Sequence, residues 1–490
     1  MIRSTLIICT LIFCSSSLHS QWEFVGNPDG FSAYNLIRGK LKIQSNTGIP
    51  HVFYQNSTIN LASEISMQRF NGTEWEYAGD QVIDNLMTFN DHLDFAFDPT
   101  NANIPIIYFH NGEVGPSSVA KLNGNTWEPL LGLSNFSFNL GSYLPTEPIN
   151  DPNTFGFDVG PTGNPVIGFS DFDCINEGFG NPPGNMSVIT HDGEEWQYLG
   201  QSCLSPRSAG SVDLEYSPVT NELFGYHKGG LEESKFDQFR ILTELNGSQW
   251  DDATSPAFDL PNVVGRMSIN PVTGNVFMYD WGYSNGIGSE RQFKVYEWDG
   301  DQLNSLHENG DLSMENSNWL TAFHPITGEM YILFNGPSLS EDGALNIKKY
   351  DGTGWVETPF SDISGLQDQS IDFVDMCFDT NGDLYILRGR DAIAKVIKRD
   401  GNITDNVSQF TAESIELQIY PNPASREVNI NFNTKSDVEI SLINALGQTV
   451  FNTKLQAPQL KINTESLSRG LYSLRFEMDG QFLVENLVVE

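Results

Sequence analysis

Pairs of short apolar segments recur along the chain, and each pair is joined by a turn rich in Pro, Thr, Asn and Gly. Seven such pairs occupy residues 41–54, 93–109, 155–169, 212–226, 265–279, 319–334 and 371–387. Their starts lie between 52 and 62 residues apart. Apolar runs of this length bounded by turn residues predict antiparallel strand pairs, repeated seven times.

A second motif follows most of these pairs. It reads Asn/Asp-Gly-x-x-Trp and begins at residues 71, 123, 192, 246 and 351, whereas Leu303 and Thr404 stand in the place of Trp in the fifth and seventh copies. Asn-Gly and Asp-Gly supply the positive φ angles that tight hairpins need. Each unit of about 53 residues is therefore predicted to hold four antiparallel strands, which is typical of propeller blades. We expect the Trp to pack between neighbouring blades.

The seventh unit has no Trp strand of its own. Residues 22–26 (WEFVG) match residues 75–79 (WEYAG) and 196–200 (WQYLG). We therefore predict that the N-terminal strand completes the last blade, which would close the ring and remove an open sheet edge. The predicted fold class is all-β: a seven-bladed propeller over residues 21–408, followed by a small sandwich.

The first twenty residues have the anatomy of a secretory signal peptide. Arg3 supplies a positive charge, residues 6–14 are apolar, and residues 15–20 are small or polar before a predicted cut after Ser20. Nine apolar residues are too few to span a bilayer, which needs about 20. No other stretch is apolar enough, so the mature chain is predicted to have no transmembrane segment.

The last 74 residues, 417–490, alternate in the manner of short strands separated by Gly turns, which predicts a small Ig-like antiparallel sandwich after a linker at 409–416. The region opens on Tyr420-Pro421-Asn422-Pro423 (in YPNPAS), continues through NALGQTV with Gly447, and includes LSRGLYSLR with Gly470 and Tyr472.

Together these motifs resemble the type A C-terminal sorting domain of type IX secretion in Bacteroidetes. The resemblance implies the type IX machinery as a partner, export across the outer membrane, and removal of the domain with release or surface attachment. The family usually ends in a basic residue, whereas this chain ends in Val488-Val489-Glu490.

The charge excludes some partners. With 26 Lys and Arg against 63 Asp and Glu, the net charge is −37, and such a surface repels nucleic acid and anionic membranes. Aromatic residues make up 12% of the chain and apolar residues 39%, enough for a large core.

Cysteine chemistry is limited after the signal peptide to Cys174, Cys203 and Cys377. In an oxidising space we predict a Cys174–Cys203 disulfide, because both residues lie in long connections around strands three and four of the third blade. Cys377 falls within an inner strand and is predicted to stay reduced and buried. No metal site or cofactor is predicted, and the sequence 379–383 (DTNGD) is interpreted as a hairpin turn rather than a calcium loop.

Two sets of residues are candidates for ligand binding. The long, dissimilar connections after strands two and four carry Phe172, Phe179, Trp281 and Tyr283, which suit sugar rings or a protein partner unless they fold back onto their own blades. Four residues before the turn, the inner strands carry Asp94, Asp213, Arg266 and Asp375, which could bind a cation or polar ligand or could line the channel as solvated side chains.

Neither Gly-x-Ser-x-Gly nor His-Glu-x-x-His nor a phosphate loop occurs. The leading hypothesis is a non-enzymatic module at the surface or in the medium that binds a glycan or a surface protein. The alternatives are a polysaccharide hydrolase or lyase that uses Asp94, Asp213 and Asp375 with Arg266 holding an acidic sugar, and a structural surface protein without a small ligand.

Overall fold

The computed structural model describes most of the chain between residues 22 and 489. The described residues are 22–57, 63–86, 92–101, 104–110, 117–133, 136, 155–171, 174, 185–204, 210–230, 238–253, 258–259, 263–283, 291–307, 319–334, 346–358, 360, 373–389, 392–400, 418–431, 438–444, 449–455, 459–464, 467–478 and 481–489. The predicted signal peptide and linker lie outside these residues. The chain divides into two units, residues 1–402 and 403–490.

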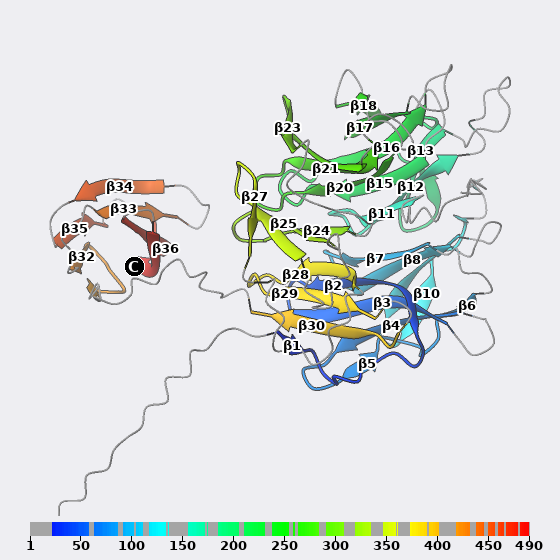
Figure 1. Cartoon of the computed structure of the whole chain (residues 1–490), viewed down its shortest axis with the longest axis horizontal. Coiled ribbons are helices and arrows are strands. Elements are labelled where there is room, and N and C mark those ends of the chain that lie inside the picture. Colours follow the sequence, from blue (N-terminus) through cyan, green and yellow to red (C-terminus); the bar gives the residue numbers. More distant parts are fainter. Residues whose placement is uncertain are drawn as a thin grey trace, which may run out of the picture. The chain divides into compact units, whose positions relative to one another are not determined.

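The described part of the first unit forms seven antiparallel sheets, five of four strands and two with a fifth short strand, which we call blades 1 to 7 in chain order (Figure 1). Blade 1 holds β2 (Leu36–Gln44), β3 (Ile49–Ser57), β4 (Ser63–Phe70) and β5 (Trp75–Tyr77), with β6 (Asp84–Leu86) beside β4. Blade 2 holds β7 (His92–Asp98), β8 (Ile104–His110), β9 (Ser117–Asn123) and β10 (Thr126–Pro129). Blade 3 holds β11 (Phe155–Val159), β12 (Pro165–Asp171), β13 (Asn185–His191) and β14 (Trp196–Tyr198).

The remaining blades repeat this plan. Blade 4 holds β15 (Gly210–Tyr216), β16 (Leu223–Gly230), β17 (Gln238–Asn246) and β18 (Gln249–Asp252), with β19 (Phe258–Asp259) beside β17. Blade 5 holds β20 (Val263–Ile269), β21 (Val276–Tyr283), β22 (Arg291–Trp298) and β23 (Leu303–His307). Blade 6 holds β24 (Trp319–Phe323), β25 (Met330–Phe334), β26 (Asn346–Tyr350) and β27 (Trp355–Glu357).

Blade 7 combines the two ends of the first unit. It holds β28 (Phe373–Phe378), β29 (Leu384–Arg388), β30 (Lys395–Arg399) and, as its outer strand, β1 (Glu23–Phe24). Glu23 pairs with Lys398 across the two strands, and the Val25 N–H donates to the Val396 carbonyl at 2.9 Å. The outer strand of blade 7 is therefore the N-terminal segment for which the WEFVG repeat argues.

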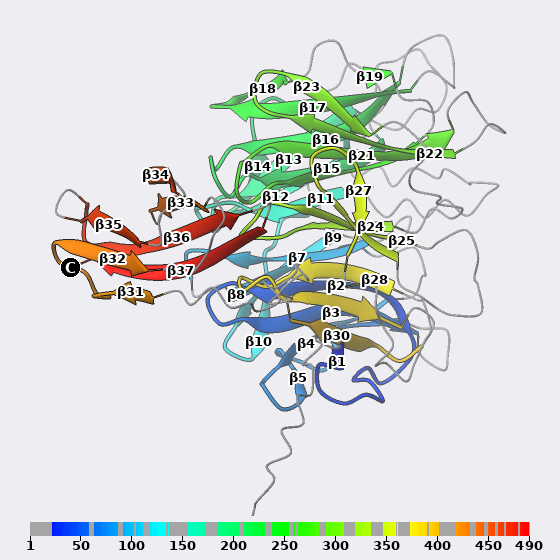
Figure 2. The same ribbon diagram turned by 60° about the vertical axis from the view of Figure 1, so that its left-hand side comes forward.

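The first strands of the blades are neighbours around a ring. β2 contacts both β7 and β28, as both views of the molecule show, and β11 contacts β7 and β15 (Figures 1 and 2). β15 contacts β20, β24 contacts β28, and the ring of Trp319 in β24 packs against Tyr279 of blade 5. Buried apolar clusters lie between successive blades, for example Phe277, Tyr279 and Phe293 of blade 5 with Ile332 and Phe334 of blade 6. The chain is thus an all-β propeller.

In blades 1 to 4 the repeated Trp links the blade to the one before it. Its indole N–H donates to a backbone carbonyl three residues after the preceding Trp: Trp75 to Val25, Trp127 to Ala78, Trp196 to Leu130 and Trp250 to Leu199, at 2.7–3.3 Å. Trp22 likewise donates to the Phe360 carbonyl of blade 6 at 3.1 Å. The Trp side chains therefore pack between blades, as the repeat pattern predicts.

A glycine makes this docking possible. Gly200 follows the Leu199 carbonyl with a φ of +81°, and a Cβ added there would lie 2.9 Å from Cδ1 of Trp250. Gly79 has the same relation to Trp127. Only glycine adopts this backbone conformation readily while leaving room for the indole.

The second unit is a sandwich of two sheets. β31 (Gln418–Tyr420), β32 (Glu427–Asn431) and β35 (Gln459–Asn463) form one sheet. β33 (Val438–Ile443), β34 (Thr449–Leu455), β36 (Gly470–Met478) and β37 (Gln481–Val489) form the other. Val428 and Ile430 of the first sheet share a buried core with Ile440, Leu442 and Leu474 of the second.

Candidate functional site

Charged side chains gather on the first strands of the blades, which are neighbours around the ring. The four residues predicted from the turn spacing all lie on these strands: Asp94 on β7, Asp213 on β15, Arg266 on β20 and Asp375 on β28. The structure adds Lys42 on β2, Asp158 on β11 and Glu215 on β15. We call these seven residues the inner-strand cluster. The three added residues stand two places closer to the turn. Side chains two residues apart on a strand share a face, so an alignment of these positions would have found them as well.

Most carboxylates of the cluster bind the backbone of the next blade. Asp375 accepts the Leu41 N–H at 2.8 Å, Asp158 accepts the Tyr216 N–H at 2.7 Å, and Asp213 accepts the Met267 N–H at 2.9 Å. Glu215 accepts the Ile269 N–H at 3.2 Å. A first strand exposes N–H groups along its free edge, and a buried N–H without a partner is costly. These acids therefore join the first strands of blades 7 and 1, 3 and 4, and 4 and 5.

Asp94 and Arg266 have different partners. Asp94 pairs with Lys42 of blade 1 at 3.1 Å and also accepts the N–H of Phe95 at 2.7 Å. The Lys42 and Asp94 side chains are 36% and 27% exposed, so solvent reaches them despite their position on innermost strands. Arg266 lies over the Trp319 ring with 5.2 Å to the ring centroid, which is a cation–π contact between blades 5 and 6.

Burial shifts the protonation of this cluster. It raises the pKa of the Asp158 carboxyl to about 6, although the Tyr216 N–H and the charge of Lys42 act in the opposite direction. Burial, together with the charges of Asp158 and Asp213, raises the pKa of Glu215 well above its ordinary value. Burial also raises the pKa of Asp213 and Asp375. For Lys42, burial alone would lower the pKa of the ammonium group. The nearby carboxylates, Asp94 first among them, outweigh burial, so the pKa is raised above its ordinary value.

These shifts predict that the fold gains stability in mild acid. A carboxyl whose folded pKa is raised favours folding while it is protonated, and this contribution is lost as the pH rises through about 6 for Asp158. We expect Asp158→Asn to raise the free energy of unfolding at pH 7.5 by roughly 1–3 kcal/mol, and to change it little at pH 4. Urea unfolding at the two pH values measures this difference.

Asp192 is the matched control for that substitution. Backbone N–H groups of Glu195 and Glu194 lower the pKa of this exposed turn carboxyl. Asp192→Asn removes favourable bonds to a charge and should not stabilise the protein at pH 7.5. A loss of stability at pH 7.5 in Asp158→Asn would contradict the prediction.

Of the other predicted residues, two lie in a described strand, near the end of a blade from which the connection after strand two leaves. Trp281 and Tyr283 are among the last three residues of β21, where Trp281 pairs with Val264 and Phe293. Their side chains lie outside the described residues, as do Phe172 and Phe179 altogether. Whether these aromatic side chains form one surface therefore stays a prediction.

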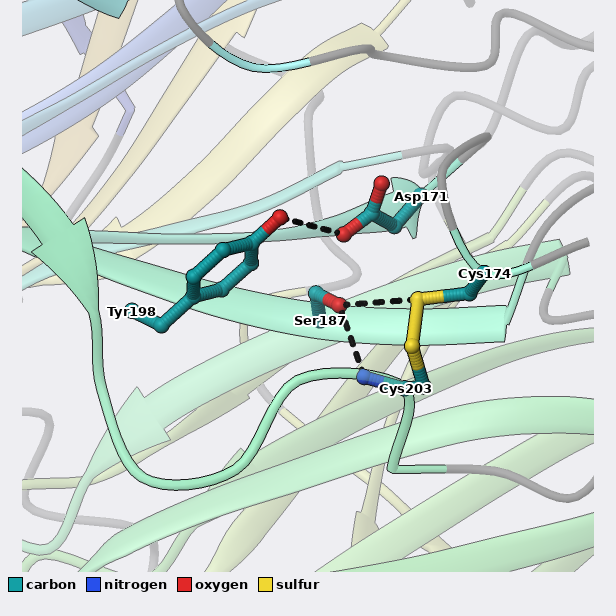
Figure 3. Close-up of a disulfide and its surroundings, with 5 residues drawn as sticks. All are labelled: Asp171, Cys174, Ser187, Tyr198 and Cys203. Atoms are coloured by element: carbon teal, nitrogen blue, oxygen red, sulfur yellow. Dashed lines mark hydrogen bonds between the residues drawn. A yellow bond between two sulfur atoms is a disulfide. The ribbon is translucent and has the colours of Figure 1, made fainter.

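A disulfide orders the same end of blade 3. Cys174 and Cys203 are joined, with Cα atoms 5.5 Å apart, and the Ser187 hydroxyl of β13 accepts the Cys203 N–H at 3.0 Å (Figure 3). The Tyr198 hydroxyl donates to the Asp171 carboxylate at 3.0 Å in the same cluster (Figure 3). Cys377 is free but half-buried rather than fully buried, and it packs against the apolar cluster between blades 7 and 1.

No cation centre forms among the described residues, since no group of three or more His, Cys, Asp or Glu is placed to hold a metal ion. The 379–383 segment is a hairpin turn in which the Asp379 carboxylate accepts the N–H groups of Asn381 and Asp383, each at 2.9 Å. Lys398 pairs with Asp383 at 2.7 Å. Within the described residues, no helix is long and apolar enough to cross a membrane.

The second unit carries the predicted sorting motif. Asn422 Oδ1 accepts the Val488 N–H at 2.9 Å, so the YPNP segment is bonded to the last strand. Tyr472 is buried in the core, and its hydroxyl donates to the Ser468 carbonyl at 2.8 Å. Gly470 begins β36, while Gly447 lies outside the described residues.

Together, the all-β propeller and the C-terminal sandwich define a multidomain all-β protein. Residues 418–490 match the family described as the secretion system C-terminal sorting domain, so the second unit is a type IX sorting domain. This domain implies contact with the secretion machinery and export to the cell surface or the medium. A comparison with curated proteins found no match.

Among solved structures, PorZ, a surface component of the type IX secretion system of Porphyromonas gingivalis, is similar at 10% identity and a TM-score of 0.42, covering 94% of this chain and 60% of PorZ. The chain thus spans about three fifths of the length of PorZ. The β-propeller domain of the Trilobed protease from Pyrococcus furiosus matches at 9% identity and a TM-score of 0.43, covering 76% of this chain and 95% of that one. The polysaccharide lyase Uly1 matches at 11% identity and 0.46, covering 74% and 90%.

Proposed function

We propose that the mature protein is a non-enzymatic binding module, which holds a glycan or a protein ligand at the end of the propeller that carries the connections after strands two and four. The observation that supports this proposal is that most inner-strand carboxyl groups are already hydrogen-bonded to the protein backbone. Asp158, Asp213, Glu215 and Asp375 each accept a backbone N–H of the next blade. Carboxyl groups held in this way link neighbouring blades and are poorly placed to attack or protonate a substrate.

The position of the ligand rests on the architecture. The short turns after strands one and three lie at one end of the described blades, while the strand ends from which the longer connections leave and the Cys174–Cys203 disulfide lie at the other. Long loops on a rigid ring are a common place for binding residues. Trp281 and Tyr283 end β21 on that side, and aromatic residues suit both sugar rings and protein partners.

A polysaccharide hydrolase or lyase is the second candidate. Its support is the raised pKa of Asp158, about 6, and the larger rise at Glu215, because perturbed carboxyl groups often mark catalytic sites. Lys42 and Arg266 would supply positive charge for an acidic sugar. Under this alternative, Asp158→Asn would abolish turnover.

The two candidates differ in what happens to the ligand. A glycan array combined with a product assay on the mature chain tests both. We expect ligand recovered unchanged, and binding weakened roughly tenfold or more by Trp281→Ala or Tyr283→Ala, since anchoring aromatic residues contribute at least this much. Asp158→Asn is the control and should bind normally.

If the mature chain cleaves a glycan and Asp158→Asn does not, the binding proposal is wrong and the enzymatic one is supported. Silence in both assays would favour a structural surface protein.

A further inference from the structure

Three consecutive blades expose an aliphatic side chain at the same position of the turn after the first strand. Val219 is 46% exposed, Val272 is 44% exposed and Ile326 is 61% exposed. The turns read SPVTNE from residue 217, NPVTGN from 270 and HPITGE from 324. We call Val219, Val272 and Ile326 the aliphatic arc.

The turn itself does not require an aliphatic residue at this place. In each turn the backbone N–H of this residue donates to the side chain two places before it: Val219 to Ser217, Val272 to Asn270 and Ile326 to His324. The same bond forms in blades 2 and 7, where polar residues occupy the position. The equivalent residues of the other blades are Asn46, Thr100, Thr162 and Asn381. An aliphatic residue at this turn position is therefore confined to blades 4 to 6.

The arc lies on turns that touch one another. A Cβ added to Gly274 would lie 3.2 Å from Cβ of Val219, and one added to Gly328 would lie 3.2 Å from Cβ of Val272. The Asn270 amide also donates to the Gly328 carbonyl at 2.9 Å. The three aliphatic groups are thus carried by one continuous strip of backbone, at the opposite end of the blades from the long connections.

Unpaired acids flank one end of the strip. Glu244 stands directly opposite Asp251 in the β17–β18 ladder of blade 4, and Glu222 closes the turn that carries Val219. Burial raises the pKa of Glu244, and the charges of Glu222 and Asp251 raise it further. Among the described residues, no Lys or Arg pairs with these three acids, whereas in blade 6 Lys349 pairs with Glu329 at 3.0 Å. Like charges facing each other across a ladder are destabilising unless a cation neutralises them.

We propose that the aliphatic arc is a docking surface for a polypeptide segment that combines aliphatic side chains with Lys or Arg. The aliphatic groups would cover Val272 and Ile326, and the cationic groups would face Glu222, Glu244 and Asp251. The chemistry favours this occupant over three others. Sugar rings pack on aromatic faces, an anionic membrane would be repelled, and a second copy would bring two acidic surfaces together.

A displayed library of random dodecapeptides, selected on the full mature chain, tests the proposal. Peptides that also bind the triple variant Val219→Thr, Val272→Thr, Ile326→Thr are removed from the library before selection. This variant carries at each position the residue found in blades 2 and 3. We expect enriched peptides to contain both aliphatic residues and Lys or Arg. Their affinity should fall about tenfold or more in the triple variant, as expected for losing three half-exposed aliphatic contacts, and should fall in high salt.

Leu131→Thr is the matched control, because Leu131 is 76% exposed in a connection after a fourth strand, and it should leave the affinity unchanged. Unchanged melting transitions in both variants would show that the fold is intact. Absence of any peptide that prefers the native chain over the triple variant would overturn the proposal. Enrichment of acidic peptides would overturn it too. So would a dimer in sedimentation, or binding of a glycan, that is lost in the triple variant and retained in Leu131→Thr.

Discussion

Deleting residues 21–26 is expected to lower the melting temperature of the mature protein by roughly 5–10 °C. The deletion removes Trp22 and Val25, which are 4% and 9% exposed, together with the bonds from Val25 to Val396 and from Trp22 to Phe360. It also removes the Val25 carbonyl that accepts the indole N–H of Trp75 at 2.7 Å. Blades 1, 6 and 7 therefore all lose contacts with one short segment.

The deletion has a second consequence, because β30 becomes the open edge of blade 7. An unpaired edge strand is a template for aggregation. Light scattering should therefore rise at temperatures at which the intact chain is clear. Glu23→Ala is the control, since this side chain is exposed and its backbone pairing with Lys398 is retained. An unchanged melting transition after the deletion would show that the N-terminal strand does not hold the ring closed.

Much of the fold can be predicted from the sequence because its determinants are local. Asn71-Gly72 and Asp192-Gly193 specify hairpins through glycine φ angles of +99° and +105°, and the structure has these hairpins. The position of β1 follows from the same local code, since WEFVG repeats the strand that blade 7 lacks. The sorting domain is confirmed on residues that are contiguous in the chain.

The inner-strand cluster shows where prediction from sequence stops. Asp213 and Asp375 lie on the first strands β15 and β28, and their bonds go to backbone N–H groups of another blade, 54 and 334 residues away. The backbone of every residue type carries the same N–H, so no residue pattern identifies these partners. The same holds for Glu215, whose carboxylate accepts the Ile269 N–H.

Trp250→Ala is expected to lower the free energy of unfolding by about 3–5 kcal/mol, measured by urea denaturation. Trp250 is 6% exposed and packs with Val188, Leu214 and Leu223. Its indole N–H donates to the Leu199 carbonyl at 2.7 Å. Trp250→Phe keeps most of the apolar contact but leaves this carbonyl without its donor, so we expect a smaller loss of about 1–3 kcal/mol.

Gly200 provides a test of how the Trp acts. Gly200→Ala should destabilise the native chain, because the new Cβ would lie 2.9 Å from Trp250 Cδ1 and the φ of +81° disfavours alanine. In a chain that already carries Trp250→Leu, the residue found at this place in blade 5, the contact with the indole is gone, and the φ penalty and a 3.1 Å approach to the Ser248 carbonyl oxygen remain. The two substitutions should therefore be less damaging together than the sum of each alone, by about 1 kcal/mol or more. Strict additivity would contradict the proposed fit of the Trp250 indole against the glycine of the preceding blade. It would mean that Trp250 stabilises the fold only through burial of its apolar surface.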